Sequence, residues 1–156
     1  MRLHIDFGRP ILPMERAAGM TDDFTLDARL AAESHALGDL ALCRVLLFDD
    51  ARFPWIVLVP RRPGLVEMTD LPRNDRHVLL DEIGTAMDAL KGATAPYKLN
   101  VAALGNSVRQ LHIHVIARFQ NDAAWPSPVW GRGERVPYKP DTLAERANKL
   151  RAAFFG

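Results

Sequence analysis

The stretch Gln110-Leu-His-Ile-His-Val-Ile116 constrains the fold of this chain more than any other part of the sequence. Apolar residues alternate there with polar ones, which is the period-two pattern of a β-strand with one face in a core. On such a strand Gln110, His112 and His114 point to one face, and the apolar residues between them point to the other. The sequence therefore predicts a strand that gathers two imidazoles and an amide on one patch.

The composition is that of a single globular domain. The chain has 156 residues, of which 48% are hydrophobic and 25% charged, a length and balance typical of one domain. Its 20 basic and 19 acidic residues give a net charge of +1, so no bulk field favours nucleic acid or a membrane. One cysteine, Cys43, excludes a disulfide framework and is expected to be a small buried hydrophobe. Because we find neither a long apolar segment nor a signal peptide, we expect a cytoplasmic protein.

The order of predicted elements mixes helices with hairpins. Residues 1–24 have no sustained periodicity and are expected to form an irregular arm, with Met20 as an alternative start, and 25–156 to form a single domain. Thr25 or Asp27 would cap the first helix, and Gly38 would end it. The predicted elements are a helix over 28–37, strands over 40–48 and 55–59, a helix over 74–91, strands over 97–103 and 108–118, an irregular tail over 124–131 and a final helix from 141. This order predicts the α+β class with an antiparallel sheet.

Three explanations compete for the two histidines of the strand. The first is that they are structural groups whose hydrogen bonds are satisfied by neighbours or solvent. The second is that they are two ligands of a metal, and the third is that they catalyse a reaction at phosphorus. Burying several polar groups side by side is costly without a purpose, which weakens the first. Zinc sites need three or four ligands, and no nearby Cys or Glu is placed to complete one. A neutral imidazole is a good nucleophile at pH 7, and a second, protonated imidazole would stabilise developing phosphoryl charge.

The same stretch resembles the motif of the histidine triad (HIT) superfamily, in which three histidines alternate with apolar residues. The resemblance extends upstream through Lys98-Leu-Asn-Val-Ala-Ala-Leu-Gly-Asn-Ser-Val108, which is similar to the family's Asn and Gly-rich turn, and covers roughly residues 40–118. It implies a HIT-like α+β fold, an antiparallel sheet of about five strands with two main helices plus a C-terminal helix here, and a homodimer.

The resemblance also implies roles for individual residues. His112 would attack the α-phosphate and form a nucleotidyl-histidine intermediate, and His114 would contact the phosphate oxygens. Asn106 and Ser107 would contact the phosphate and leaving group, and Asn100 would help to arrange the site. No cofactor or metal is required by this mechanism, although a divalent cation could accompany the substrate.

The turn before the triad also suits an anion on physical grounds. Gly105 permits backbone conformations closed to other residues, so successive amides can face a phosphate. A tight Gly-Asn-Ser turn is equally a good turn without a ligand. At the first hairpin, Asp49 is the candidate for the ribose hydroxyls, against the alternative of a solvated turn. Weaker candidates for a distal phosphate or for the pocket wall are Arg61, Arg62, Arg118, Trp125 and Trp130.

Three positions depart from the family pattern. Gln110 replaces the first histidine and cannot titrate, so a proton relay through it is lost. Asn106 stands where Gln is usual and is one methylene shorter. Trp55 stands where a further histidine is frequent, and we treat Gln110 and Trp55 as a possible paired change.

The sequence is thus interpreted as a nucleotide hydrolase acting on dinucleoside polyphosphates or nucleoside phosphoramidates, with an adenine nucleotide favoured by the family. A non-catalytic nucleotide-binding protein, a nucleotidyltransferase and a metal-dependent enzyme using His112 and His114 remain as alternatives.

Overall fold

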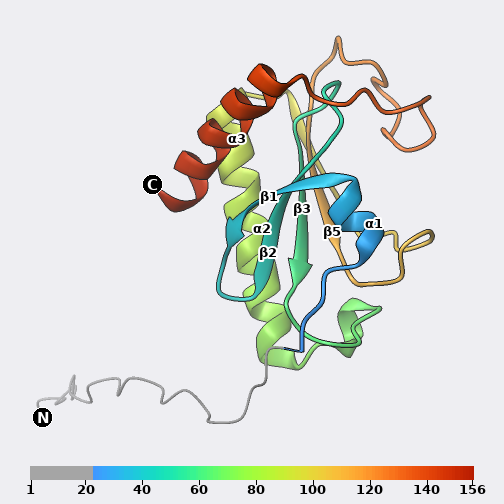
Figure 1. Ribbon diagram of the computed structural model, residues 1–156, viewed down its shortest axis with the longest axis vertical. Coiled ribbons are helices and arrows are strands. Elements are labelled where there is room, and N and C mark those ends of the chain that lie inside the picture. Colours follow the sequence, from blue (N-terminus) through green and yellow to red (C-terminus); the bar gives the residue numbers. More distant parts are fainter. Residues whose placement is uncertain (1–22) are drawn as a thin grey trace, which may run out of the picture.

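The computed structural model describes residues 23–156 (Figure 1). The predicted arm and the alternative start at Met20 therefore lie almost wholly outside the described residues. In chain order the elements are α1 (Ala28–Ala32), β1 (Ser34–Asp39), β2 (Cys43–Phe48), β3 (Trp55–Pro60), the 3-10 helix η1 (Met68–Asp70), α2 (Arg73–Thr94), β4 (Lys98–Ala102), β5 (Ile113–Arg118) and α3 (Pro140–Phe155). The α+β class with a five-stranded antiparallel sheet is confirmed.

The sheet places the histidine strand in its interior. The strand order is β1-β2-β3-β5-β4, and every neighbouring pair is antiparallel. The predicted hairpin between β2 and β3 is confirmed, with Leu46 opposite Val57. Since β5 pairs with β3 on one side and β4 on the other, its side chains are fixed by two ladders.

The two faces of the sheet are covered differently. Helix α2 runs along one face, over β5 and β3, and α3 packs beside α2 (Figure 1). That face holds the larger core, in which Ile113, Val115 and Ala117 of β5 are buried. The opposite face carries a smaller apolar cluster, which includes Trp55 and Ile116. The alternation predicted for the histidine strand is therefore real, with its apolar set toward α2.

The helix predicted over 28–37 is wrong in its second half. Only α1 is helical, and the chain then turns into β1, which pairs with β2 in register from Ser34 opposite Phe48. Leu37 enters the core beneath α2 and α3, and the register shifts beside it, between Ala36 and Gly38. Pairing along the edge of β2 has overridden the helix propensity of this Ala- and Leu-rich run.

Three predicted boundaries also differ from the structure. β5 begins at Ile113 rather than near 108, because the backbone of Leu111 bonds Leu65 instead of joining a ladder. β2 begins at Cys43, after a turn. Helix α2 continues past its predicted end at residue 91 to Thr94, and it ends where Ala95 takes a left-handed conformation before Pro96. A proline cannot continue a helix, which explains the stop.

A buried carboxylate ties α2 to the start of β2. Glu82 is 6% exposed, and its two oxygens accept the backbone N–H groups of Leu42 at 2.7 Å and Cys43 at 2.8 Å. Cys43 is fully buried, as predicted. Burial raises the pKa of its thiol, and the neighbouring Glu82 acts in the same direction. Cys43 is thus an inert member of the core rather than a nucleophile.

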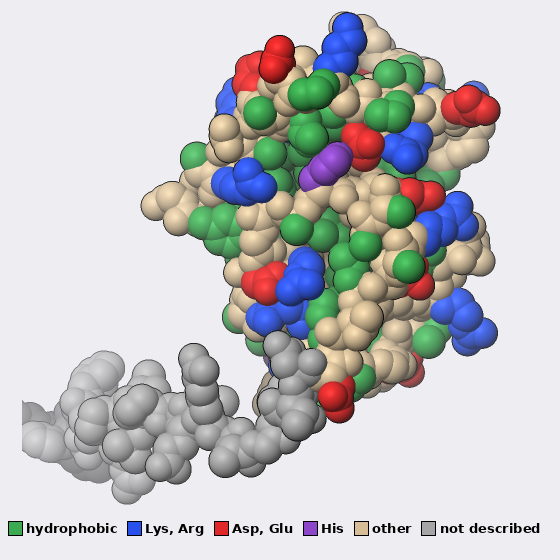
Figure 2. All heavy atoms as spheres, in the orientation of Figure 1, with side chains coloured by type: hydrophobic (Ala, Val, Ile, Leu, Met, Phe, Trp, Pro, Cys, Tyr) green, Lys and Arg blue, Asp and Glu red, His purple; other side chains and the backbone are tan. Residues whose placement is uncertain are grey.

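The surface carries no single-sign patch on the face shown in Figure 2, where acidic and basic side chains are interspersed. Among residues 23–156, no helix is both long enough and apolar enough to cross a membrane.

Candidate functional site

The two histidines of the central stretch meet on the face of the sheet opposite α2. His114 lies on β5, opposite Val57 of β3 and Ala102 of β4, and His112 directly precedes the strand. Their ring centroids are 4.8 Å apart at an interplanar angle of 84°. Both are buried, at 6% and 7% exposure. The predicted convergence of these two imidazoles is confirmed.

The tautomer of His112 is set by the backbone of Gln110. Nδ1 of His112 lies 2.7 Å from the carbonyl oxygen of Gln110. A carbonyl only accepts hydrogen bonds, so Nδ1 carries the proton and donates it. In the neutral ring Nε2 is then left with a free lone pair. His112 is therefore oriented as a nucleophile.

His114 is fixed in the opposite tautomer by Trp55. The indole Nε1 of Trp55 donates to Nδ1 of His114 at 3.0 Å. An indole N–H only donates, so Nδ1 of His114 accepts and its proton sits on Nε2. Burial, with the nearby imidazole of His112, lowers the pKa of His114 to about 3. The expectation of a protonated second imidazole is therefore wrong, because His114 is a neutral donor at pH 7.

A glycine-containing loop closes over the pair. Gly105 has a φ of +69°, a conformation that L side chains rarely adopt, and it lies between β4 and β5. Gly105, Asn106 and Ser107 line the same pocket as His112 and His114. Gly105 thus takes a backbone conformation closed to most other residues, as predicted, and the loop places amide and hydroxyl groups in the pocket of the imidazoles.

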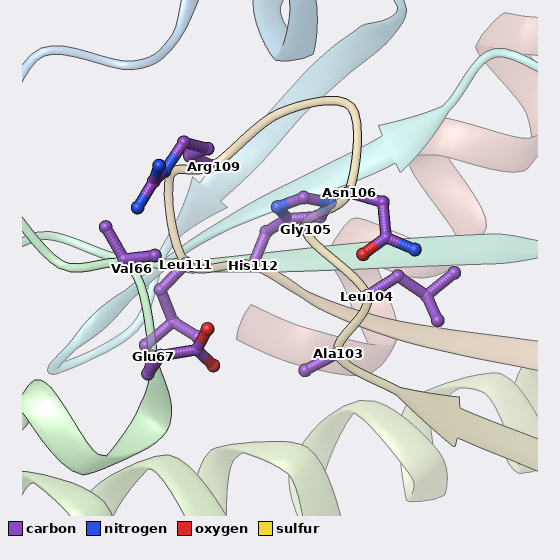
Figure 3. Close-up of a pocket in the computed structure, with 9 residues that line it drawn as sticks. All are labelled: Val66, Glu67, Ala103, Leu104, Gly105, Asn106, Arg109, Leu111 and His112. Carbon is purple, nitrogen blue, oxygen red and sulfur yellow. The ribbon is translucent and has the colours of Figure 1, made fainter.

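His112 stands between two pockets that share the glycine loop. One, of about 300 Å³, has a largely apolar wall, and the other, of about 280 Å³, is more polar (Figure 3). The first is lined by Arg29, Leu30, Glu33, Phe48, Trp55, Leu104, Gly105, Asn106, Ser107, Val108, His112, His114 and Trp130. The second is lined by Val66, Glu67, Ala103, Leu104, Gly105, Asn106, Arg109, Leu111 and His112. A substrate with two unlike halves could therefore place its junction at His112.

Comparison with known proteins identifies the family of this site. The family model described as the HIT domain matches residues 29–121, more than half of the chain. The chain belongs to the HIT family. It is 43% identical to a histidine triad protein from Bradyrhizobium japonicum, covering 85% of this chain and 98% of that one, with a TM-score of 0.83. It is also 44% identical to a histidine triad protein from Marinobacter aquaeolei VT8, covering 84% and 96% of the two chains, with a TM-score of 0.82. No curated protein matches.

Two tryptophans, Trp55 and Trp130, pack against His114. Trp130, from the irregular tail predicted over 124–131, makes edge contacts with His114 at 5.4 Å and with Trp55 at 5.7 Å between ring centroids. Phe48 stacks against Trp55 at 4.5 Å. This aromatic wall keeps water from His114 and explains why its pKa is so low.

Asn100 lies on the same face of the sheet, but its amide serves a structural network. Its Oδ1 accepts from Arg118 Nη1 at 2.8 Å, and Arg118 also makes a bidentate pair with Asp122 at 2.8 and 3.1 Å. Burial alone would raise the pKa of Asp122, but its hydrogen bonds, led by that of Arg118, hold it at about 2. Arg118 Nη2 also donates to the Ser127 carbonyl and so anchors the irregular segment that carries Trp130. Arg118 is therefore not free for a distal phosphate.

The structure also turns two other predicted site residues away from the histidine pair. The side chain of Gln110 bonds the backbone at Thr25 and Asp27 and lines neither pocket. The carboxylate of Asp49 accepts the Tyr138 backbone N–H at 2.9 Å and Arg135 Nη1 at 3.0 Å. Asp49 therefore holds the segment before α3 at the tip of the hairpin.

The remaining candidates are partly structural. Arg61 donates to the carbonyls of Leu40 and Ala41, and Arg62 pairs with Asp75 at 2.9 Å. Trp125 packs edge-on against Tyr97 at 5.3 Å, with the Arg118 guanidinium 5.7 Å from its ring.

Several pocket residues were missed by the sequence reasoning. Leu30 and Glu33 come from α1 and its end, Phe48 precedes the aspartates of the hairpin, and Glu67 and Arg109 line the second pocket (Figure 3). Phe48 and Arg109 adjoin predicted site residues, which was a usable signal. Nothing in the sequence indicated Leu30, Glu33 or Glu67, because only tertiary packing brings these residues to His112.

Within residues 23–156, no group of three or more His, Cys, Asp or Glu side chains is placed to hold a metal ion.

Proposed function

We propose that this HIT protein hydrolyses a nucleotide conjugate at its α-phosphate, with His112 as the nucleophile. The observation that carries the proposal is the opposite tautomers of the two imidazoles. His112 presents a lone pair at Nε2 because its Nδ1 donates to Gln110, whereas His114 presents an N–H because its Nδ1 accepts from Trp55. A nucleophile and a neutral hydrogen-bond donor thus lie side by side, which suits attack on phosphorus.

The proposed chemistry has two steps. Nε2 of His112 forms a bond to the α-phosphorus while the bond from phosphorus to the leaving group breaks, and the leaving group departs with that electron pair. The ring becomes a nucleotidyl-imidazolium, and its positive charge is stabilised because Nδ1–H still donates to the Gln110 carbonyl. The Nε2–H of His114 donates to a phosphoryl oxygen throughout. Water then attacks phosphorus, the bond to Nε2 breaks with its electron pair returning to the nitrogen, and a nucleoside monophosphate is released. The proton lost by water goes to the departed leaving group or to solvent.

The two pockets support a substrate with unlike halves. The apolar wall of Leu30, Phe48 and Trp130 suits a nucleoside base, and we propose adenine. The second pocket, with Glu67 and Arg109, suits a polar leaving group (Figure 3). Both open onto the loop of Gly105, where the α-phosphate would lie. Dinucleoside polyphosphates and nucleoside phosphoramidates both fit this division.

We further propose that the chain forms a homodimer. β4 is an edge strand of the sheet, and Tyr97, Val101 and Leu104 in and beside it are exposed large apolar residues. An open edge with apolar neighbours is a template for pairing with another chain. Light scattering after size exclusion should report twice the chain mass of 17.4 kDa.

The function is tested by turnover of diadenosine tetraphosphate and of an adenosine phosphoramidate, with and without EDTA. The parent should turn over at least one of them, and acid quenching should trap one nucleotidyl group on the protein. His112→Ala should abolish both, whereas His77→Ala, at an exposed position on α2, should abolish neither.

Each alternative has its own result in the same experiment. Binding of AMP without turnover by the parent would indicate a non-catalytic nucleotide-binding protein. Turnover only with a phosphate-bearing acceptor would indicate a transferase. Loss of activity in EDTA and recovery with zinc would refute the nucleotidyl-histidine reaction and favour a metal-dependent enzyme.

A further inference from the structure

Gln110 makes two contacts that the proposed chemistry does not use. Its side-chain Oε1 accepts the backbone N–H of Asp27 at 2.9 Å, and its Nε2 donates to the carbonyl of Thr25 at 2.8 Å. These two backbone groups flank Leu26. In a parallel sheet the N–H and C=O of one residue bond the groups on either side of a residue in the neighbouring strand in the same way, so the side-chain amide of Gln110 mimics one rung of a sheet ladder. The rung joins segments more than 80 residues apart in the sequence.

A histidine at this position could not make the same pair of bonds. The oxygen and nitrogen of an amide sit on one carbon and can bond two groups of one extended segment. The two ring nitrogens of imidazole direct their donor and acceptor away from each other, so one ring cannot serve both Thr25 and Asp27. Glutamate keeps the acceptor for Asp27 but loses the donor for Thr25. The site therefore requires an amide.

The segment held by Gln110 leads into α1, which forms one wall of the apolar pocket proposed to bind the nucleoside. Asp27 caps α1, because its Oδ1 accepts the N–H groups of Arg29 at 2.8 Å and Leu30 at 3.4 Å. Arg29, Leu30 and Glu33 then line the pocket beside the histidines. Helix α1 has five residues, too few to be stable by itself. Its position depends on the burial of Leu30 and on the anchor at Gln110.

The backbone and the side chain of Gln110 thus act on the two halves of the site. Its carbonyl accepts from Nδ1 of His112 and fixes the nucleophile. Its amide fixes the segment that leads into α1. Gln110 therefore connects the element that carries the reacting nitrogen to the element that carries the pocket wall.

We propose that Gln110 is a positioning residue that determines nucleotide affinity by holding α1 against the histidine strand, an inference that rests on the proposed function. It does not relay a proton. Loss of the amide lets α1 move, so nucleotide binding weakens while the reaction at His112 keeps its rate.

The test compares Gln110→Ala, Gln110→Glu and Gln110→His with the parent, and Gln120→Ala serves as the matched control because Gln120 is exposed. The readouts are Kd for AMP, kcat and KM for the conjugate across pH, and hydrogen exchange at the Asp27 amide and through α1. Loss of two hydrogen bonds should raise Kd and KM about tenfold. The kcat should stay within about twofold of the parent value, and the shape of its pH profile should not change. A contact that positions the pocket wall acts on nucleotide binding and not on the reaction at His112.

Exchange separates this inference from the proposed function. The Asp27 amide should exchange at least about tenfold faster in Gln110→Ala, because it loses its acceptor. Unchanged exchange would overturn the inference, whatever the activity of the parent. So would a fall in kcat with an altered pH profile and an unchanged KM, which would assign Gln110 to the reaction. If the parent neither binds nor turns over nucleotide, the proposed function fails, whereas faster exchange would still support the anchor.

Discussion

Lowering the pH from 7 to 4.5 should destabilise the folded chain through His114. The ring is buried and its Nδ1 is occupied by the Trp55 N–H, so the folded state has no place for a second proton. The pKa of His114 is lowered from 6.5 to about 3. Between these two values the unfolded chain binds a proton that the folded chain does not. The free energy of unfolding therefore falls as the pH falls below 6.5.

The size of the effect follows from the two pKa values. At pH 4.5 the unfolded histidine is two pH units below its pKa of 6.5, while the folded one is still neutral. Each unit corresponds to about 1.36 kcal/mol, and a small part of the unfolded histidine is already protonated at pH 7. The expected loss is about 2.5 kcal/mol, a large share of a typical total of roughly 5–15 kcal/mol.

The assay is urea unfolding at pH 7 and 4.5, followed by far-ultraviolet circular dichroism. His114→Asn is the informative variant, because the Asn Oδ1 can accept from Trp55 in place of Nδ1 but does not titrate. The parent should lose about 2.5 kcal/mol more than this variant between the two pH values. His77→Asn, on the exposed side of α2, should behave as the parent does. Equal losses in parent and His114→Asn would refute the neutral, donor-fixed state of His114.

Two further substitutions test the surroundings of the pair. Trp55→Phe keeps an aromatic ring but removes the hydrogen-bond donor to His114. The value of kcat/KM should therefore fall about tenfold in steady-state assays. An unchanged kcat/KM would mean that His114 needs no fixed tautomer. Arg118→Met leaves the buried Asp122 without its cation and should lower the free energy of unfolding by about 3 kcal/mol in urea titrations. The double variant Arg118→Met/Asp122→Asn should recover part of that loss, and no recovery would show that the ion pair is not the cause.

The sequence predicted the existence of the strands more accurately than the residues at which the strands and helices begin and end. Alternation in 110–116 identified β5, and the continuous apolar run 55–59 identified β3, whose residues are buried on both faces of the sheet. Residues 34–37 of β1 were predicted as helix, since they continue the Ala- and Leu-rich run that begins at Ala28 and favours helix locally. Only the open edge of β2 makes this segment a strand, and that edge is invisible before the sheet exists.

The site was predictable as far as the local pattern reached. His112, His114 and the Gly105 loop lie within ten residues of one another, and the structure brings them together. Asn100 and Asp49 were predicted from position alone. Their side chains are taken by Arg118 and by the segment before α3, which no local pattern indicates.

Gln110 and Trp55, the possible paired change in the sequence, do not compensate for each other, because they act on different partners. Trp55 bonds His114, whereas Gln110 bonds the chain before α1. Neither side chain changes its protonation near pH 7, so each fixes a geometry rather than a charge. A histidine restored at position 110 would have to break the anchor to Thr25 and Asp27 before it could face the pair. Gln110→His should therefore weaken nucleotide binding without increasing turnover, although the substitution brings the sequence closer to the family motif.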